Sequence, residues 1–455
     1  PYQPLSAFAG NANLIGLDPL VQAGLLKAEE LAFLEGLPRD YCDFGQLIPA
    51  KRALLEEAAR RFKANRAGPE LVAEYEDFQH RQQGWLDDYA LFRVLKTAHG
   101  ERPWPEWEPQ YVQRDPAALA RAREQYREAI EVTRVTQFLF DRQWRRLKRY
   151  AGEKGICLFG DIPIYIALDS SDAWANREML LVDADGTPSS VAGVPPDYFS
   201  EDGQLWGNPL YDWEYHQRTG YAWWIERMRH MGRITDLVRI DHFRGFESFW
   251  SVPFGEKTAR SGAWVPGPGD ALFRAMKDAL GPLPIVAEDL GVITPQVEAL
   301  RLGQNFPGMV VLQFEVGDPG FDPDAIDENS VCYTGTHDND TTQGWFRGDG
   351  DDTRSATEIA EQRAQTLRVT GGTAATIHED MVRLAFSSRS GLAMAPMQDF
   401  LGLGSCARIN TPGTTADNWR WRMAEGAFDR HLAAAIAKEV AASSREPEKP
   451  LLLAE

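Results

Sequence analysis

Short apolar runs alternate with helical patterns along the second part of the chain, from about residue 156 onward. Six runs rich in apolar and β-branched residues predict strands: ICLFGDIPIYI, DLVRID, LPIVAEDL, GMVVLQFE, VCYTGTHD and LAMAPMQD. Between several of them, apolar residues recur every three or four positions, as in YAWWIERMRHMG and GDALFRAMKDALG, which predicts helices. A strand followed by a helix, repeated, is typical of a parallel sheet.

Acidic residues stand at or just beyond the end of five of these six predicted strands. They are Asp161, Asp241, Glu288 with Asp289, Asp338 and Asp399. In a (β/α) barrel the functional residues follow the carboxyl ends of the strands, so that they meet at one site. A doubly wound open sheet competes with the barrel, but no G-x-G-x-x-G turn follows any of the strands. We therefore predict an α/β chain whose residues 1–455 form one (β/α)8 TIM barrel domain.

Two long segments interrupt the alternation of strands and helices. The hydrophobic pattern of residues 50–150 predicts a helical insertion. At helical spacing, one face of a helix there carries Trp85, Tyr89, Phe92 and Leu95. Residues 170–215 are rich in glycine, proline and aromatic residues, so we expect an irregular, loop-rich insertion beside the site. Aromatic rings in such polar loops suit stacking against a sugar, although a buried core explains most of the aromatic residues.

Composition and charge narrow the classes of function. The chain of 455 residues is 43% hydrophobic, which is enough for a large core. Its formal net charge of −19 argues against nucleic acid and anionic membranes, because both bind basic surfaces. The four widely spaced cysteines predict neither a zinc ribbon nor a disulfide framework, and a reducing, cytoplasmic compartment is the simpler expectation.

Two of the carboxylates suit the cleavage of a glycosidic bond with retention. That reaction needs a carboxylate nucleophile and a carboxylic acid roughly 5 Å apart, and Asp241 and Glu288 are the candidates. Arg239 lies two residues before Asp241 on the same face of a strand, where its charge lowers the pKa of a carboxylate. Glu288 follows the apolar residues IVA, and burial raises the pKa of an acid.

The remaining polar residues at the strand ends leave several interpretations open. Asp338 could contact the hydroxyls of a distorted sugar, with His242 and His337 donating hydrogen bonds to the same ring. As neutral core histidines the two would be unremarkable, and an aspartate after a strand often caps the next helix. A site for a divalent ion is another interpretation, because aspartate and histidine side chains bind such ions and Asp241, His242, His337 and Asp338 are available. Against a metal site, no H-E-x-x-H motif occurs and no H-x-H ends a strand. A non-catalytic sugar-binding protein would need the aromatic residues but neither the acid nor the base.

Long motifs in order along nearly the whole chain resemble those of amylomaltases, also called disproportionating enzymes, which are 4-α-glucanotransferases of the α-amylase superfamily. The motifs are PYQPLSAFAGN, WLDDYALFRVLK, GDIPIYIALDSSDAWAN, AGVPPDYFSEDGQLWGNPLYDW, VRIDHFRGFESFW, VAEDLGVITP, YTGTHDNDTTQGW and RINTPGTTADNWRWR. The resemblance implies transfer of segments of α-1,4-glucans (maltooligosaccharides, amylose or glycogen) to the 4-hydroxyl of an acceptor. It implies no cofactor, no metal and no C-terminal β-domain.

The resemblance also implies a role for individual residues. Asp241 corresponds to the nucleophile, Glu288 to the general acid/base and Asp338 to the stabiliser of the transition state. The donor-sugar contacts correspond to Arg239, His337, Asp161, Asp318 and Asn410, together with Tyr2, whose ring stacks against the scissile sugar. Tyr198, Phe199 and Trp206 correspond to an acceptor-side loop within residues 170–215 that helps to exclude water.

Two departures from the family pattern affect these expectations. The family carries a first βα unit ahead of the segment that corresponds to PYQ, so we expect the first strand of the barrel to be missing and the chain to be unstable or weakly active without it. Gln304 and Asn305 replace a more apolar or glycine-bearing turn, with little consequence expected. From the residues alone, a retaining α-1,4-glucan hydrolase stays an alternative, because only acceptor-side packing decides whether sugar or water attacks the intermediate.

Overall fold

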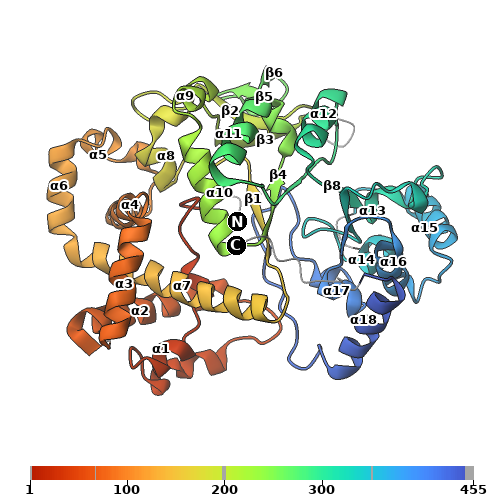
Figure 1. Ribbon diagram of the computed structural model, residues 1–455, viewed down its shortest axis with the longest axis horizontal. Coiled ribbons are helices and arrows are strands. Elements are labelled where there is room, and N and C mark those ends of the chain that lie inside the picture. Colours follow the sequence, from red (N-terminus) through yellow and green to blue (C-terminus); the bar gives the residue numbers. More distant parts are fainter. Residues whose placement is uncertain (1–2, 67, 197–200, 350–351, 446–455) are drawn as a thin grey trace. The chain divides into compact units, whose positions relative to one another are not determined.

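The computed structural model describes residues 3–66, 68–196, 201–349 and 352–445 (Figure 1). Helices and strands follow one another along the chain, which confirms the predicted α/β class. The residues divide into two compact units. Unit 1 contains Pro1–Glu35 and Ile48–Leu300, and unit 2 contains Gly36–Leu47 and Arg301–Glu455.

Unit 1 contains a parallel sheet of three strands in the order β1-β4-β7, all of them predicted from the sequence. The strands are β1 (Phe159–Pro163), β4 (Leu237–Asp241) and β7 (Ile285–Ala287). Ile162, Val238, Ile240 and all three residues of β7 are buried, whereas Phe159 and Leu237 at the starts of β1 and β4 are half-buried. The register sets Asp161 beside Arg239 and Pro163 beside Asp241, so the polar residues of two strands share one end of the sheet.

The segment after β1 leaves the sheet because side chains bind its carbonyl groups. Arg227 donates to the carbonyl oxygens of Pro163 (2.6 Å) and Ile164 (3.0 Å). The hydroxyl of Tyr211 donates to the same oxygen of Ile164 at 3.0 Å. The strand therefore ends at Pro163, earlier than the apolar run IPIYI suggests, and the end of β1 that carries Asp161 is fixed.

A second sheet in unit 1 is antiparallel, in the order β3-β2-β5-β6. It consists of β2 (Ser190–Val194), β3 (Gln204–Pro209), β5 (Ser248–Pro253) and β6 (Ala263–Pro266). The expectation of an irregular insertion is therefore wrong for β2 and β3, which lie within residues 170–215. Val191 and Val252 lie opposite each other and are buried together, and this apolar pairing gives the insertion its order.

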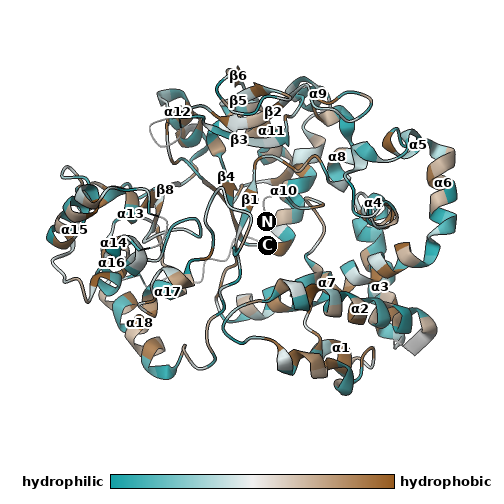
Figure 2. Ribbon diagram, turned by 180° about the vertical axis from the view of Figure 1, so that it is seen from behind, coloured by the Kyte–Doolittle hydropathy of each residue, from teal (hydrophilic) through white to brown (hydrophobic). Residues whose placement is uncertain are grey.

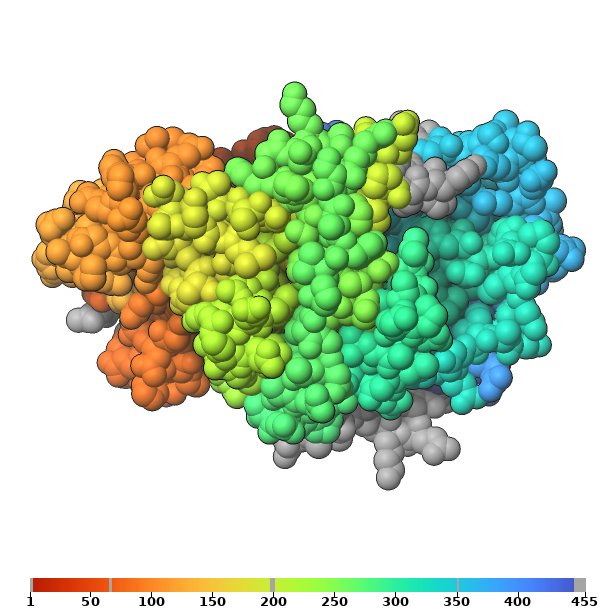
Figure 3. Space-filling view, turned by 90° about the horizontal axis from the view of Figure 1, so that it is seen from above, coloured from red at the N-terminus to blue at the C-terminus, as the bar shows by residue number. Residues whose placement is uncertain are grey.

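Helices make up most of the remainder of unit 1. They are α1 (Asp18–Gln22), α3 (Pro69–Gln82), α4 (Leu86–Ala98), α5 (Pro109–Val112), α6 (Pro116–Gln125), α7 (Arg127–Glu153), α8 (Ser171–Ala175), α9 (Trp213–Arg218), α10 (Ala222–Ile234) and α11 (Asp270–Leu280), together with most of α2 (Phe44–Arg61) and of α12 (Pro295–Gln304), each of which crosses a boundary between the units. Helices α2, α3 and α7 are striped teal and brown in Figure 2, as amphipathic helices are. Their apolar faces meet where Phe138 of α7 packs on Tyr75 and Phe78 of α3. In Figure 3 the later part of unit 1 forms a continuous yellow and green surface.

Unit 2 contains the other three predicted strands, in the parallel order β10-β9-β8. The strands are β8 (Gly308–Val311), β9 (Ser330–Tyr333) and β10 (Leu392–Met394). Its helices are α13 (Leu312–Glu315), α14 (Thr342–Arg347), α15 (Ala356–Thr370), α16 (Ile377–Ser387), α17 (Met397–Phe400) and α18 (Arg430–Ala442). Every residue of β9 is buried, which fixes the start of the segment that follows it. A single barrel domain and a helical insertion at residues 50–150 stay predictions.

Candidate active site

One arginine joins the carboxylates of two neighbouring strands of unit 1, Asp161 in the middle of β1 and Asp241 at the end of β4. Arg239 is buried, and its Nη2 donates to Oδ1 of Asp241 at 2.8 Å. Its Nη1 donates to Oδ2 of Asp161 at 2.7 Å. Burial alone lowers the pKa of Arg239, but the negative charges of Asp161, Asp241 and Glu288 raise it overall, so the guanidinium stays charged.

Glu288 follows β7 and its carboxylate is held by two backbone N–H groups. Its Oε2 accepts from the N–H of His242 at 2.8 Å, and its Oε1 accepts from the N–H of Leu290 at 3.0 Å. Burial, followed by the negative charge of Asp241, raises the pKa of Glu288 to about 7, although Arg239 and the two N–H groups act in the opposite direction. This is the direction that the apolar residues before Glu288 predict, and it gives an acid that is half protonated near neutral pH.

His242 turns the chain so that its backbone reaches Glu288. Its φ of 57° lies in the left-handed region, which costs a residue with a side chain roughly 1–2 kcal/mol. The ring packs edge-on against Trp206 of β3, with 4.7 Å between the ring centres, and its buried Nε2 has no hydrogen-bond partner among the described residues. Burial and the neighbouring Arg244 lower the pKa of His242 to about 3, so the imidazole is neutral.

In unit 2, Asp338 lies in the segment after β9 and contacts residues some seventy positions later. The Nδ2 of Asn410 donates to Oδ1 of Asp338 at 2.6 Å. Arg408 donates from Nη2 to the carbonyl oxygen of Asp338 at 2.7 Å and from Nε to that of Asn410 at 2.8 Å. His337 lies beside Asp338, with 3.6 Å between Nε2 and Oδ2, and its ring lies 5.2 Å from that of Trp419. The structure thus brings together Asp338, His337 and Asn410.

Asp399, the last of the acidic residues at the strand ends, has a structural role. It is buried and accepts from the hydroxyl of Thr334 at 2.6 Å. It also accepts from the N–H and the hydroxyl of Thr342 at 2.8 and 2.9 Å, at the first residue of α14. Asp399 therefore supports the start of α14, an earlier helix, whereas the simpler interpretation predicts that it caps the helix after its own strand.

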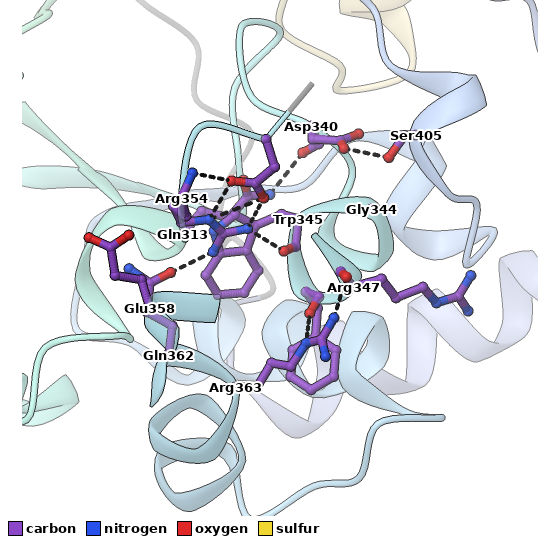
Figure 4. Close-up of polar contacts among 12 residues, drawn as sticks. Gln313, Asp340, Gly344, Trp345, Arg347, Arg354, Glu358, Gln362, Arg363 and Ser405 are labelled. Atoms are coloured by element: carbon purple, nitrogen blue, oxygen red, sulfur yellow. Dashed lines mark hydrogen bonds and ion pairs between the residues drawn. The ribbon is translucent and has the colours of Figure 1, made fainter. Parts of the chain in front are cut away.

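The far end of α14 is held by two arginines, drawn in Figure 4. Arg354 donates to the carbonyl oxygen of Trp345 at 2.5 Å and lies over the ring of that residue, 5.3 Å from its centre. Arg363 donates to the carbonyl oxygens of Phe346 and Arg347. The carbonyl oxygen of Trp345 also accepts from the N–H of Gly348 at 3.2 Å, and the two arginines add hydrogen bonds to the last carbonyls of the helix.

Asp340 connects this helix to the segment that carries Asp338. Its Oδ2 accepts from the hydroxyl of Ser405 at 2.5 Å, and its carbonyl oxygen accepts from Nε2 of Gln313 at 2.9 Å (Figure 4). Burial raises the pKa of Asp340. Asp340, Arg354 and Arg363 were missed in the sequence, where only the motif YTGTHDNDTTQGW, which contains Asp340, drew attention to this part of the chain.

The other predicted site residues have the following places. Trp206 is half-buried on β3 and also packs against Tyr165, with 6.4 Å between the ring centres. Asp318 lies in a turn of unit 2, where its Oδ1 accepts from the N–H of Gly320 at 2.7 Å. Tyr2, Tyr198 and Phe199 lie outside the described residues.

The described residues contain neither a metal-binding cluster nor a membrane-spanning helix. Residues 3–66, 68–196, 201–349 and 352–445 contain no group of three or more His, Cys, Asp or Glu side chains placed to hold a metal ion. Within the same part of the chain, no helix has the length and apolar character needed to cross a membrane.

Comparisons with known proteins agree on one family. The family model described as 4-alpha-glucanotransferase matches residues 1–427. A 4-alpha-glucanotransferase of Synechocystis is 46% identical over 431 residues, which is 93% of this chain and 83% of that protein. One from Thermus thermophilus is 42% identical over 98% of this chain and 88% of its own length. The solved structure of amylomaltase from Streptococcus agalactiae in complex with acarbose superposes with a TM-score of 0.92 at 35% identity, covering 98% of this chain and 89% of that one.

Proposed function

The chain belongs to the 4-alpha-glucanotransferase family and is an enzyme of that kind, and on this premise we propose that it transfers α-1,4-glucan segments between maltooligosaccharides by double displacement. In the first step Asp241 attacks the anomeric carbon of the donor while Glu288 protonates the departing oxygen. A covalent glycosyl-enzyme results. In the second step Glu288 takes the proton from the 4-hydroxyl of the acceptor, which displaces Asp241 and restores the original anomeric configuration.

One observation carries this proposal. Arg239 pairs with Asp241 at 2.8 Å and so stabilises a negative charge there, whereas burial raises the pKa of Glu288 to about 7 and favours its protonated form. A pair of carboxyl groups in opposite protonation states is what the first step requires.

The other site residues are proposed to bind the sugars. Asp338 contacts hydroxyl groups of the donor sugar as positive charge develops at its anomeric carbon, and its bond to Asn410 at 2.6 Å supports a fixed orientation. The remaining proposed contacts with substrate are Tyr2, Asp161, Tyr198, Phe199, Trp206, Arg239, His242, Asp318, His337 and Asn410. The donors and acceptors are maltooligosaccharides, amylose and glycogen.

The proposal extends to the fold, the cofactors and the location. We propose a (β/α)8 barrel of the α-amylase superfamily, supported by six parallel-paired strands among the described residues and by acidic residues within or after five of them. Neither a metal nor a cofactor takes part in the steps above. A cytoplasmic location is supported by the number and wide spacing of the four cysteines, which suit neither a disulfide framework nor a zinc ribbon.

The experiment that tests the proposed function is incubation with maltotriose, in which both the product ladder and the total reducing ends are followed. Transfer gives glucose and longer glucans at constant reducing ends, and the Asp241→Asn variant gives neither. Reducing ends that rise without longer products would identify a hydrolase instead. Binding of maltotriose without any reaction would favour a non-catalytic maltodextrin-binding protein.

The pH dependence of transfer follows from Glu288. Its pKa of about 7 lies above its ordinary value, so the carboxyl is protonated below pH 7 and ionised above it. Because the first step needs the protonated form, we expect kcat/KM for maltotriose to fall about tenfold per pH unit above pH 7. The measurement is kcat/KM from pH 5 to 9, with circular dichroism confirming a folded protein at each pH. An unchanged rate from pH 6 to 9 would contradict the assignment.

Trp206 is expected to limit hydrolysis. Its ring covers His242, which follows Asp241 directly, and an acceptor-side ring at this place keeps water from the glycosyl-enzyme. We expect Trp206→Ala to raise the proportion of intermediates lost to water on the order of tenfold, seen as new reducing ends from maltotriose. Leu205→Ala, which alters an exposed apolar neighbour on β3, is the matched control. Equal hydrolysis by both variants would contradict the role of Trp206.

A further inference from the structure

The side chain of Arg244 joins three segments of unit 1 that are far apart in sequence. It belongs to the short turn η6 (Phe243–Phe246) that follows Asp241, and only 8% of it is exposed. Its Nη1 donates to the carbonyl oxygen of Val292 at 2.5 Å. Its guanidinium carbon lies 3.9 Å from the centre of the ring of Trp264 on β6. The loop after β7 and the edge strand β6 therefore meet at this arginine.

The contact with Val292 leads directly to the acid/base. Within residues 288–292, the N–H of Leu290 donates to Oε1 of Glu288 at 3.0 Å. Gly291 then turns the chain with a φ of 81°, a value that glycine adopts readily, and brings the carbonyl of Val292 to Arg244. Val292 is 68% exposed, so its own packing does little to hold this end of the loop. The bond from Arg244 therefore restrains the N–H group of Leu290.

A buried arginine is a costly way to fill this space. Burial lowers the pKa of Arg244 against the opposing effect of Glu247, and its buried Nε has no hydrogen-bond partner among the described residues. An apolar side chain would avoid the loss of hydration of a charged group. The hydrogen bond from Arg244 holds the carbonyl group of Val292 in place, and this contact explains why an arginine occupies the position.

Trp264 shields this arginine from water. Strand β6 is the edge of the antiparallel sheet, in the green part of the surface in Figure 3, and all its residues are exposed. The ring of Trp264 is 41% exposed, so it adds little to the core. It stacks on the guanidinium and meets the ring of Trp250 edge-on, with 5.2 Å between the ring centres. An aromatic ring over a guanidinium both attracts it and excludes water from one side.

We propose that Arg244, covered by Trp264, is a positioning residue for Glu288: it fixes the loop of residues 288–292 and so sets the orientation of the acid/base carboxyl. The inference rests on the proposed function of Glu288. Arg244 acts through the backbone, from Val292 to Leu290, and Trp264 acts through Arg244. Nothing in the contacts requires either residue to touch the substrate.

The test compares Arg244→Met, Arg244→Lys, Trp264→Ala, Trp264→Phe and the double variant Arg244→Met/Trp264→Ala in the full chain. With maltotriose, we expect Arg244→Met to lower kcat on the order of 10²-fold with little change in KM, because a displacement of about 1 Å has that effect. Trp264→Ala should have a smaller effect of the same kind, and Trp264→Phe and Arg244→Lys should recover part of the activity. Because the two residues act as a unit, the double variant should resemble Arg244→Met alone. Arg218→Met removes an exposed arginine 5.8 Å from the ring of Tyr215 and is the matched control.

A second readout does not depend on turnover. The Glu288 carboxyl is titrated by infrared difference spectroscopy, with its signal assigned by its absence in Glu288→Gln. The groups that face this carboxyl are Asp241, Arg239 and the N–H groups of His242 and Leu290, with Asp161 paired to Arg239. Only the contact with Leu290 is expected to change in Arg244→Met. Since that N–H favours the ionised carboxylate, its loss should move the midpoint and the alkaline limb of kcat/KM to higher pH.

The outcomes are distinguishable. If Arg244→Met only lowers the melting temperature, and the folded enzyme keeps the wild-type kcat and midpoint, the role is structural and the proposal is wrong. A rise in KM at constant kcat would make Arg244 a substrate contact and overturn it as well. If the wild-type protein forms no product ladder but the midpoint still shifts in Arg244→Met, the proposed function fails while the coupling between Arg244 and Glu288 stands.

Discussion

The Asp241→Asn variant is expected to lose transfer between maltotriose molecules by about 10⁴-fold or more while it remains folded. An amide oxygen is a poor nucleophile, so the covalent glycosyl-enzyme does not form. The fold should tolerate the change, because Arg239 keeps its bond to Asp161 at 2.7 Å and an asparagine side chain has the same size as the native aspartate. The measurement is the initial rate of glucose release from maltotriose, with a thermal melt recorded on the same preparation.

The matched control is Asp88→Asn. Asp88 pairs with Arg114 at 2.7 Å in the same unit, so this variant removes an arginine-paired carboxylate of the same length away from the strand ends. We expect its activity to stay within about twofold of the wild type, with a change in stability of roughly 1 kcal/mol or less. An Asp241→Asn protein that keeps a tenth of the wild-type rate would exclude Asp241 as the nucleophile.

The elements near the site could be predicted because their sequence pattern is strong. Each of the six apolar runs contains a strand, since buried parallel strands need consecutive apolar residues. The pairing of Arg239 with Asp241 also follows from sequence, because side chains two residues apart on a strand lie on the same face. The lengths of the strands could not be predicted, since β1 ends where Arg227 binds the carbonyl oxygen of Pro163 from a distant helix.

The contacts that hold Glu288 lay beyond sequence reasoning. The N–H of His242 reaches Glu288 only because its residue adopts a left-handed conformation, which no local pattern around VRIDHFRG requires. The contact of Arg244 with Val292 depends on how two loops lie, 48 positions apart. The bond between Asn410 and Asp338 joins positions 72 apart, and only the family resemblance singled out Asn410 as a contact of the donor sugar. Asp399 and Asp241 both stand at the ends of predicted strands. Asp399 nevertheless binds the start of a helix, through contacts with distant residues that the sequence pattern does not reveal.

The second large effect is expected for Glu288→Gln, and it should depend on the leaving group. With maltotriose we expect a loss of about 10³-fold, because the departing sugar oxygen is no longer protonated. With maltotriosyl fluoride as donor, fluoride leaves without a proton, so the first step should keep most of its rate. The second step lacks its base, and the covalent glycosyl-enzyme should accumulate and be detectable by mass spectrometry. Azide, an acceptor that needs no base, should then release it as the glycosyl azide.

The matched control is Glu131→Gln, which alters another largely buried glutamate, one that accepts from the hydroxyl of Tyr75 at 2.7 Å. It should leave both donors unaffected and keep the fall in rate above pH 7, whereas that fall should disappear in Glu288→Gln with the fluoride donor. If Glu288→Gln lost both donors to the same extent, and azide released nothing, proton transfer could not be its main role. Glu288 would then act chiefly through its bonds to the N–H groups of His242 and Leu290, as a support for the turn that follows Asp241.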